Sequence, residues 1–328
     1  MDSSPYRVDD RARRAPTLRR GLAGMLLAVA VYGAFALWQG VGKMGAELER
    51  FAWWTFGAAC LLALGNYLLR WLKWEFYLAR LGIRGVGAHD SLLTFLSGFV
   101  LTITPGKVGE VFKSWVLLRT HGVSFERSAP IVVAERLTDV IAVVLLIAVG
   151  SLAFPGGLLW AGLGAVAVAG VLGVVASRRA SHGIIRVLER LPGPLAGIGP
   201  KLHAAYDSLT TLVKPANLVV PTLLSLGGWT LECAALWVIL RGLGQSTGFG
   251  LATFFYATST LAGALVPVPG GLGVTEATLR EQMRGLGHVA PAASTAAMIL
   301  VRFATLWFAV LVGFVALSLL KRRYPSRL

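Results

Sequence analysis

Residues 267–273 read Pro-Val-Pro-Gly-Gly-Leu-Gly, and a related turn, Thr-Pro-Gly-Lys-Val-Gly-Glu, occupies residues 104–110. Each turn ends an apolar run, 91–104 before the first turn and 251–268 before the second. Both runs are short or broken for a membrane span, which needs about 20 apolar residues. A short apolar helix that stops at Pro and Gly, with another helix after it, predicts a re-entrant hairpin whose turn lies inside the bilayer and is covered by protein.

The composition indicates a membrane protein. Of the 328 residues, 55% are hydrophobic and 14% are charged, whereas a soluble domain carries about 25% charged residues. This excludes a soluble globular enzyme, a disordered chain and a disulfide-rich secreted module. Cys60 and Cys233 lie in apolar runs and indicate no disulfide or metal site. Six runs are long enough to cross a membrane, at 21–38, 51–69, 129–152, 158–176, 216–240 and 292–320.

The distribution of Lys and Arg residues between the two sides of the membrane favours hairpins over full crossings for the two short runs. The chain has 31 Lys and Arg against 16 Asp and Glu, a net charge of +15. With six crossings, two hairpins and a cytoplasmic N-terminus, most of the basic residues fall on the cytoplasmic side, as the positive-inside rule requires. Eight full crossings would place the basic loops at 107–127 and 178–214 outside. We therefore expect a multi-pass protein of the cell inner membrane, with both termini in the cytoplasm.

The second half of the sequence repeats the first. Residues 63–82 align with 225–244, the Pro-Gly-x-x-Gly turn recurs, and an arginine inside a later span recurs as Arg136 and Arg302. Three crossings per copy is an odd number, so the second copy is expected upside down, an arrangement typical of transporters. The predicted fold is an all-α polytopic membrane protein. It is an inverted repeat of two helices, a re-entrant hairpin and a helix, with six full crossings plus two re-entrant hairpins.

The domain boundaries follow from this repeat. We expect a basic cytoplasmic tail at 1–20, a first membrane repeat at 21–154, a second at 155–320 and a cytoplasmic tail at 321–328. The second repeat includes a basic loop at 177–215 that is interrupted by Pro and Gly. This loop is expected to lay amphipathic helices on the anionic cytoplasmic leaflet.

Charged residues inside the predicted spans are candidates for function, because burying one costs about 2.5–3.5 kcal/mol on insertion scales. Glu135, Arg136 and Asp139 are spaced so that one helix face can pair them. Both a structural ion pair and a headgroup or proton site fit this cluster. Arg302 has no acidic neighbour in its own span and therefore needs a partner elsewhere or an anionic ligand. Arg70 and Lys73 either line the cavity or only extend their charged ends to the interface.

The two turns are the second candidate feature. Glycine after proline exposes backbone N–H groups at a helix start, where the helix dipole adds about half a positive charge and favours phosphate. A simple tight turn is the alternative. Lipid headgroup binding is assigned to Gly106, Lys107, Gly109, Arg136, Gly270, Gly271, Gly273 and Arg302. Charge balance or proton coupling is assigned to Glu110, Glu135, Asp139, Glu232 and Glu276.

The sequence contains none of the usual enzyme motifs. It has no nucleotide-phosphate loop, no dinucleotide glycine fingerprint and no paired His or Cys at metal-ligand spacing. We therefore predict a protein that is not an enzyme, with no cofactor, no metal and no nucleic-acid partner.

Segments 99–110, 134–139 and 267–276, together with 66–74 and Arg302, resemble the flippase-like family named after the lysylphosphatidylglycerol synthase transmembrane region. The likeness covers nearly the whole chain. It implies a bacterial inner-membrane protein that moves lipids between leaflets. In the multiple peptide resistance factors of this family, the module precedes a soluble aminoacyl-transfer domain, and because this chain ends at Leu328 that synthesis activity is not expected. The first turn departs from the second in lacking the doubled proline and glycine.

The hypothesis is a membrane lipid flippase or scramblase. An anionic lipid, either a phospholipid or a lipid linked to polyprenyl phosphate, would pass between leaflets through a central electropositive cavity. Its partners would be membrane lipids and enzymes of lipid or glycolipid synthesis. Two alternatives remain. One is an integral-membrane enzyme acting on lipid phosphates, for which Glu135 and Asp139 are the available acidic pair, and the other is a non-transporting scaffold of a lipid or glycolipid synthesis complex.

Overall fold

The computed structural model describes residues 41–102, 110–157, 159, 162–164, 166, 169–170, 205, 208–266 and 268–328. These residues form helices and turns and contain no β-strand, which confirms the all-α prediction. Several predicted features lie outside the described residues. They are the tail at 1–20, the span at 21–38, the turn residues Gly106, Lys107 and Gly109, most of the span at 158–176 and most of the loop at 177–215.

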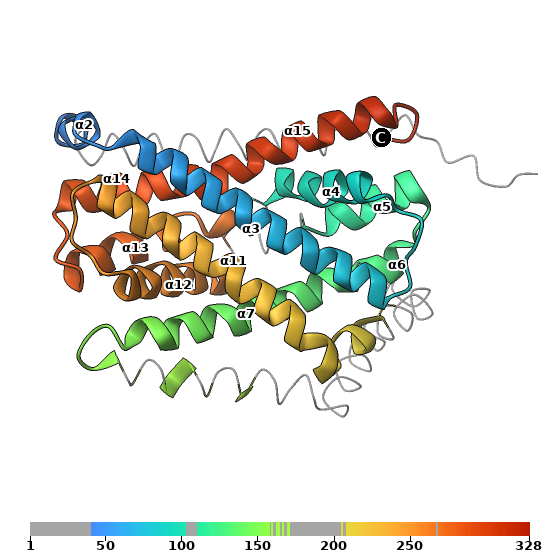
Figure 1. Cartoon of the computed structure of the whole chain (residues 1–328), viewed down its shortest axis with the longest axis horizontal. Helices are drawn as coiled ribbons and strands as arrows, with labels where there is room; N and C mark the ends of the chain where they lie inside the picture. The colour runs from blue at the N-terminus through green and yellow to red at the C-terminus, as the bar shows by residue number, and fades with distance from the viewer. Residues whose placement is uncertain are drawn as a thin grey trace, which may run out of the picture.

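The helices of the two halves follow in chain order (Figure 1). The first half contains α2 (Val41–Glu49), α3 (Trp53–Arg80), α4 (Ala88–Ser97), the 3-10 turn η1 (Gly98–Leu101), α5 (Phe112–His121), α6 (Phe125–Ser128) and α7 (Pro130–Ser151). The second half contains α11 (Pro215–Gly242), α12 (Phe249–Leu265), the 3-10 turn η4 (Pro269–Gly271), α13 (Val274–Gly285), α14 (Pro291–Arg302), the π-helical turn η5 (Phe303–Trp307) and α15 (Phe308–Arg323).

Three helical stretches of the described chain are long and apolar enough to cross a membrane: α3, α11 and the continuous stretch Pro291–Arg323. Helix α7 has a similar length of 22 residues. These four correspond to the spans predicted at 51–69, 216–240, 292–320 and 129–152. Helix α3 continues to Arg80, well past the predicted end at residue 69. It does so because the charges of Arg70 and Lys73 are accommodated among neighbouring helices and do not mark the end of the span.

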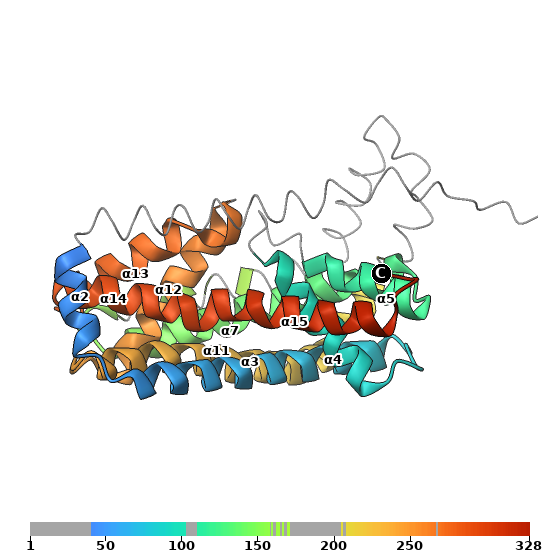
Figure 2. The same cartoon turned by 90° about the horizontal axis from the view of Figure 1, so that it is seen from above.

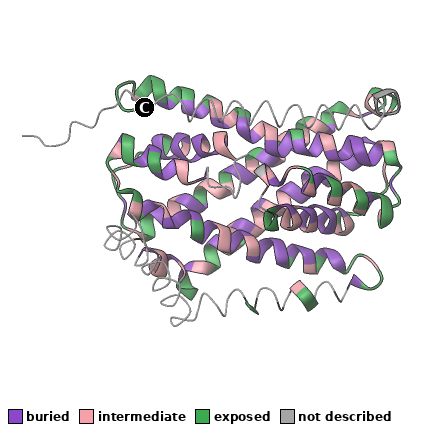
Figure 3. Cartoon of the chain, turned by 180° about the vertical axis from the view of Figure 1, so that it is seen from behind, coloured by how far each residue is buried: buried purple, intermediate pink, exposed green. Residues whose placement is uncertain are grey.

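The long helices expose apolar side chains along one face. On α3 these are Leu61, Leu64, Leu68 and Leu72, which are 41–69% exposed. On α15 they are Leu311, Val315 and Leu319. Residues three or four apart share one face of a helix, and soluble monomers rarely leave such apolar stripes uncovered. Buried residues gather on the inward faces (Figure 3), so the outer faces are suited to contact lipid.

Helices α3 and α11 run side by side in opposite directions (Figure 1). Their contact is reciprocal. A Cβ atom added to Gly65 would lie 3.0 Å from Cδ1 of Leu231, and one added to Gly227 would lie 3.2 Å from Cδ1 of Leu69. Gly65 matches Gly227 in the sequence repeat and Leu69 matches Leu231, so each half presents the same small and large residues to the other.

The shorter helices lie at opposite ends of this central pair (Figures 1 and 2). Helices α4 and α5 lie where α3 finishes, whereas α12 and α13 lie where α3 begins. Helix α12 packs on α7 from the first half, and α4 with η1 packs on α15 from the second half. Each half therefore supports the short helices of the other.

The last residue of α15 and the residues after it bind the end of the molecule that contains α4 and α5. The Tyr324 hydroxyl donates to Oδ2 of Asp90 at 2.7 Å, and Nε of Arg323 lies 3.1 Å from Oδ1 of the same carboxylate. Arg327 donates to the backbone carbonyl of Thr120 at 2.5 Å. The segment predicted as a tail at 321–328 thus packs against the beginning of α4 and the end of α5.

Both contacts between the long and the short helices depend on glycine. A Cβ atom on Gly150 of α7 would lie 2.7 Å from the backbone nitrogen of Phe254 in α12. One on Gly313 of α15 would lie 2.7 Å from the backbone nitrogen of Val100 in η1. Backbone atoms cannot turn aside as the end of a side chain can, so a larger residue would push the helices apart.

Gly150→Ala and Gly313→Ala are each expected to lower the free energy of unfolding by about 1–3 kcal/mol, the usual effect of overpacking. Gly57→Ala in α3 is the matched control, because a Cβ atom there has no neighbour within 4 Å. It should be neutral or slightly stabilising, since Ala favours helix over Gly. Thermal denaturation in a mild detergent compares the three variants, and equal midpoints would contradict the packing described.

Candidate functional site

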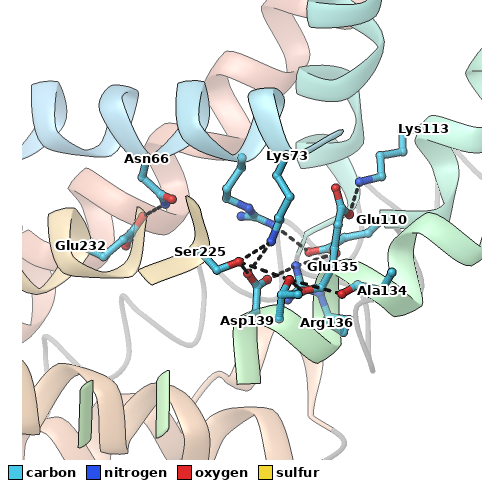
Figure 4. Close-up of polar contacts among 12 residues, drawn as sticks. Asn66, Lys73, Glu110, Lys113, Ala134, Glu135, Arg136, Asp139, Ser225 and Glu232 are labelled. Atoms are coloured by element: carbon cyan, nitrogen blue, oxygen red, sulfur yellow. Dashed lines mark hydrogen bonds and ion pairs between the residues drawn. The ribbon is translucent and has the colours of Figure 1, made fainter. Parts of the chain in front are cut away.

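Charged side chains gather between α3, α7 and α11 (Figure 4), and a further ion pair joins α13 to α14. The ten side chains of this set, five basic and five acidic, come from both halves of the chain. Each contacts a residue on another helix or turn. The basic members are Arg70, Lys73, Lys113, Arg136 and Arg302. The acidic members are Glu110, Glu135, Asp139, Glu232 and Glu276.

Asp139 joins three helices. Its Oδ1 accepts hydrogen bonds from Nζ of Lys73 on α3 at 2.7 Å and from Oγ of Ser225 on α11 at 2.9 Å. Its Oδ2 lies 3.0 Å from Nη2 of Arg136, one turn back on α7. Lys73 is 1% exposed, so its ammonium group stays inside and does not reach the interface. A buried charge is tolerated only when it is paired and hydrogen-bonded, and Asp139 supplies both contacts.

Glu110 is the last residue of the first turn, and its position is described. Its Oε2 lies 2.8 Å from Nη2 of Arg136, and its Oε1 lies 3.5 Å from Nη2 of Arg70. Arg70, Lys73 and Arg136 therefore share the two carboxylates of Glu110 and Asp139. Among the described residues this group carries one more positive than negative charge.

Glu135 points to a different partner. Its Oε2 accepts a short hydrogen bond from Nζ of Lys113 on α5. The same ammonium group lies 4.6 Å from the ring centre of Trp74 and 5.2 Å from that of Phe95. Aromatic faces attract cations most strongly where water is excluded. This contact holds α5 against α7, and it gives Glu135 a different closest cation from that of Asp139.

Arg302, the counterpart of Arg136, has a carboxylate partner on another helix. Its Nε lies 2.6 Å from Oε1 of Glu276 on α13, and its Nη2 donates to the carbonyl oxygen of Gly270 at 3.1 Å. Oε2 of Glu276 accepts from the backbone N–H of Gly273 at 2.6 Å. A side chain of the protein therefore occupies the N–H group that we expected to face a ligand phosphate.

The second turn has the backbone geometry that its glycines suggest. Gly270, Gly271 and Gly273 have φ angles of 61°, 70° and 86°, a region that residues with a Cβ atom rarely adopt. Gly271 also packs against Gly263 of α12, where a Cβ atom would lie 3.1 Å from the Gly263 carbonyl oxygen. Chain reversal alone accounts for these glycines, and Gly270 and Gly271 also line both cavities described below.

Glu232 on α11 has neutral hydrogen-bond donors. Its Oε1 accepts from Nδ2 of Asn66 at 2.5 Å, and its Oε2 accepts a short hydrogen bond from the Tyr256 hydroxyl. Glu232 is 5% exposed. From the sequence alone we predicted no role for Asn66, Tyr256 or Ser225. The signal that could have found them is a polar side chain within an apolar run, because such a group needs a partner inside the membrane.

Two cavities adjoin at the second turn. The first has a volume of about 90 Å³, and the polar side chains in its lining are Asn66, Arg70, Glu110, Glu232, Tyr256 and Arg302, among others. The second, which we call the Arg136 cavity, has a volume of about 220 Å³. It is lined by Arg136 and Asp139 and by the apolar residues Val140, Val143, Leu261, Val266 and Val268. Trp229, Thr260, Gly263, Ala264, Gly270 and Gly271 line both cavities.

These contacts describe a polar centre with ion pairs that bridge helices. Within the described ranges, no three His, Cys, Asp or Glu side chains come together in a way that could hold a metal ion. What the arrangement offers chemically is guanidinium groups beside a cavity that also has an apolar wall. Such a site suits an anion carried on a hydrocarbon chain.

Lys73→Met is expected to lower the free energy of unfolding by about 3–5 kcal/mol, because it leaves Asp139 buried without its closest cation. Lys73→Met/Asp139→Leu removes both charges and should recover part of this loss. Arg80→Met removes an exposed charge from the same helix, and we expect a change within about 0.5 kcal/mol. Denaturation in detergent measures all three, and a double variant less stable than Lys73→Met would contradict the pairing.

Comparison with known proteins places the chain in a family of membrane proteins. The model of the family described as the lysylphosphatidylglycerol synthase TM region matches residues 25–313. The glycosyltransferase AglD of Haloferax volcanii is 23% identical over 323 residues, covering 85% of this chain and 51% of that protein, so the chain spans about half of its length. A UPF0104 membrane protein of Methanothermobacter thermautotrophicus is 22% identical over 278 residues, covering 77% of this chain and 80% of that protein. The chain is therefore a membrane protein that belongs to the lysylphosphatidylglycerol synthase transmembrane-region family.

Proposed function

We propose that this protein moves an anionic lipid, one that carries a phosphate group, between the two leaflets of a cell inner membrane. The observation that carries the proposal is the position of Arg70, Arg136 and Arg302, which line adjoining cavities inside a body of membrane-spanning helices. Charged residues at such depth are unfavourable unless they pair, and they commonly mark the path of an ion or a charged substrate. Membership of a lipid-related membrane family agrees with this reading.

The proposal includes an inverted repeat with two re-entrant hairpins. The antiparallel α3 and α11 with their reciprocal Gly–Leu contacts support it. So does the position of the two short helix pairs at opposite ends of the molecule. The ion pair Glu110–Arg136 in the first half has its counterpart in the second half, where Glu276 and Arg302 occupy the matching repeat positions. Transporters built from inverted repeats bind substrate near the midplane, where the repeats meet.

In this mechanism the headgroup crosses through the polar centre while the hydrocarbon chains stay in the bilayer. A guanidinium group can exchange a carboxylate for a phosphate, which it binds through two parallel hydrogen bonds. Such an exchange leaves no arginine without an anion at any stage. Glu232 is held by neutral donors and is the carboxylate we propose for proton coupling.

The sequence has no nucleotide-binding motif, so the proposed transport runs down a lipid gradient or uses an ion gradient. The proposal has both termini in the cytoplasm, the orientation that the positive-inside rule favours. A relative that is named a glycosyltransferase supports a role beside enzymes of lipid or glycolipid synthesis, as a carrier of their lipid.

The geometry favours transport over catalysis on lipid phosphates. A catalytic pair of carboxylates has to face a common point, but Glu135 binds Lys113 whereas Asp139 binds Lys73 and Ser225. The two acids therefore face different helices. A lipid-turnover assay with and without divalent metal separates the two functions, and turnover of the lipid would count against transport.

Proteoliposomes with a fluorescent lipid in both leaflets test the proposal directly. Quenching of the outer leaflet should be followed by faster loss of the inner signal when the protein is present. Arg136→Ala should slow this movement at least tenfold, whereas Arg80→Ala, at an exposed position, should not. No acceleration with any member of a panel of anionic phospholipids and polyprenyl phosphates would contradict the proposal.

A further inference from the structure

The two matching arginines differ in how their donors are used. Arg302 has Glu276 at Nε and the Gly270 carbonyl at Nη2. Nη2 of Arg136 lies within ion-pair distance of Glu110 and Asp139. Among the described residues, however, the buried Nε and Nη2 atoms of Arg136 make no hydrogen bond. The Arg136 guanidinium is thus held through ion pairs at Nη2, and its buried Nε makes no hydrogen bond to a described residue.

The charge around Arg136 also differs from that around Arg302. Arg302 and Glu276 form a balanced pair. Arg136 belongs to the group in which three basic side chains share two carboxylates, because Asp139 is already bound by Lys73 and Glu110 also faces Arg70. Taken by themselves these five side chains carry one excess positive charge, and the carboxylates of Glu135 and Glu232 also act on Arg70. An added anion at Arg302 would have to displace Glu276, which also caps α13.

The Arg136 cavity has a shape and a lining suited to a charged group on a hydrocarbon chain. Arg136 and Asp139 supply the polar side, and Val140, Val143, Leu261 and Val266 supply the apolar side. Its volume of about 220 Å³ is below the roughly 300–1,000 Å³ of pockets that enclose a drug-sized ligand. It would therefore take a phosphate and the first carbons of its chain, with the remainder in the bilayer.

We propose that the Arg136 cavity is the phosphate-binding site and that Arg136 contacts the phosphate of a single-chain or prenyl-type lipid. Arg302 instead holds the second turn in place. This inference rests on the proposed function and deepens it, because it names the cavity, the arginine and the ligand chemistry. The guanidinium presents its donors in one plane, which fits two phosphate oxygens. The apolar wall distinguishes a lipid phosphate from free phosphate.

Binding to the purified full chain in neutral detergent tests the inference, by isothermal titration with three probes. Farnesyl phosphate carries both the phosphate and the chain, farnesol carries only the chain, and inorganic phosphate carries only the anion. The unmodified protein should bind farnesyl phosphate at least tenfold more tightly than either of the others. Arg136→Gln should weaken this binding at least tenfold, and Arg302→Gln should weaken it much less.

Two further variants keep the test sharp if Arg136→Gln does not fold. Ala264→Phe adds bulk at an exposed residue that lines the cavity, changes no charge and should also weaken farnesyl phosphate binding. Arg136→Lys keeps the charge but loses the planar pair of donors, and we expect a several-fold weakening. Arg80→Gln removes an exposed charge at the end of α3 and should leave binding unchanged.

Three outcomes would overturn the inference: an effect of Arg302→Gln equal to or larger than that of Arg136→Gln, binding of inorganic phosphate as tight as that of farnesyl phosphate, or no binding of any probe. The proteoliposome assay then separates the two claims. Lipid movement that persists in any of these cases leaves the proposed function standing without this site, whereas absence of both binding and movement ends both.

Discussion

The pairing of buried charges between helices is the constraint on which the rest of this structure depends. Removing a charge from water is unfavourable by several kcal/mol unless an opposite charge and hydrogen bonds replace the water. Lys73 with Asp139 fixes α3 against α7, and Arg302 with Glu276 fixes α14 against α13. These contacts set how each helix is rotated about its axis. They also decide what can enter the centre, because an anion can replace a carboxylate without leaving a cation unpaired.

Away from the buried charges, glycine residues allow the helices to pack closely. Gly65 and Gly227 let α3 and α11 approach closely, while Gly150 and Gly313 bring α7 and α15 against the short helices. Small residues drive close helix packing in lipid, where the hydrophobic effect gives helices no preference for one another over the acyl chains. The ion pairs and the glycine contacts therefore act together, the first in the polar centre and the second along the apolar sides.

The positions of the long helices could be predicted from the sequence, but the side-chain contacts between them could not. Runs of apolar residues predicted α3, α7, α11 and Pro291–Arg323, because length and hydropathy are local properties. The predicted end of the α3 span at residue 69 was too early, because Arg70 and Lys73 look like a membrane boundary as long as their partners are unknown. Lys73 meets Asp139 66 positions away and Asn66 meets Glu232 166 positions away. Such contacts depend on helix rotation, which no local pattern specifies.

The central claim is that the two short helix pairs enter the membrane from opposite faces and bring the arginines to its middle. Ser124→Cys, between α5 and α6, and Ala290→Cys, between α13 and α14, place single exposed thiols at the two ends once Cys60 and Cys233 are replaced. Labelling with a membrane-impermeant maleimide, in intact cells and in inverted vesicles, measures which side each thiol faces. The account predicts opposite sides for the two positions, and labelling of both from the same side would contradict it.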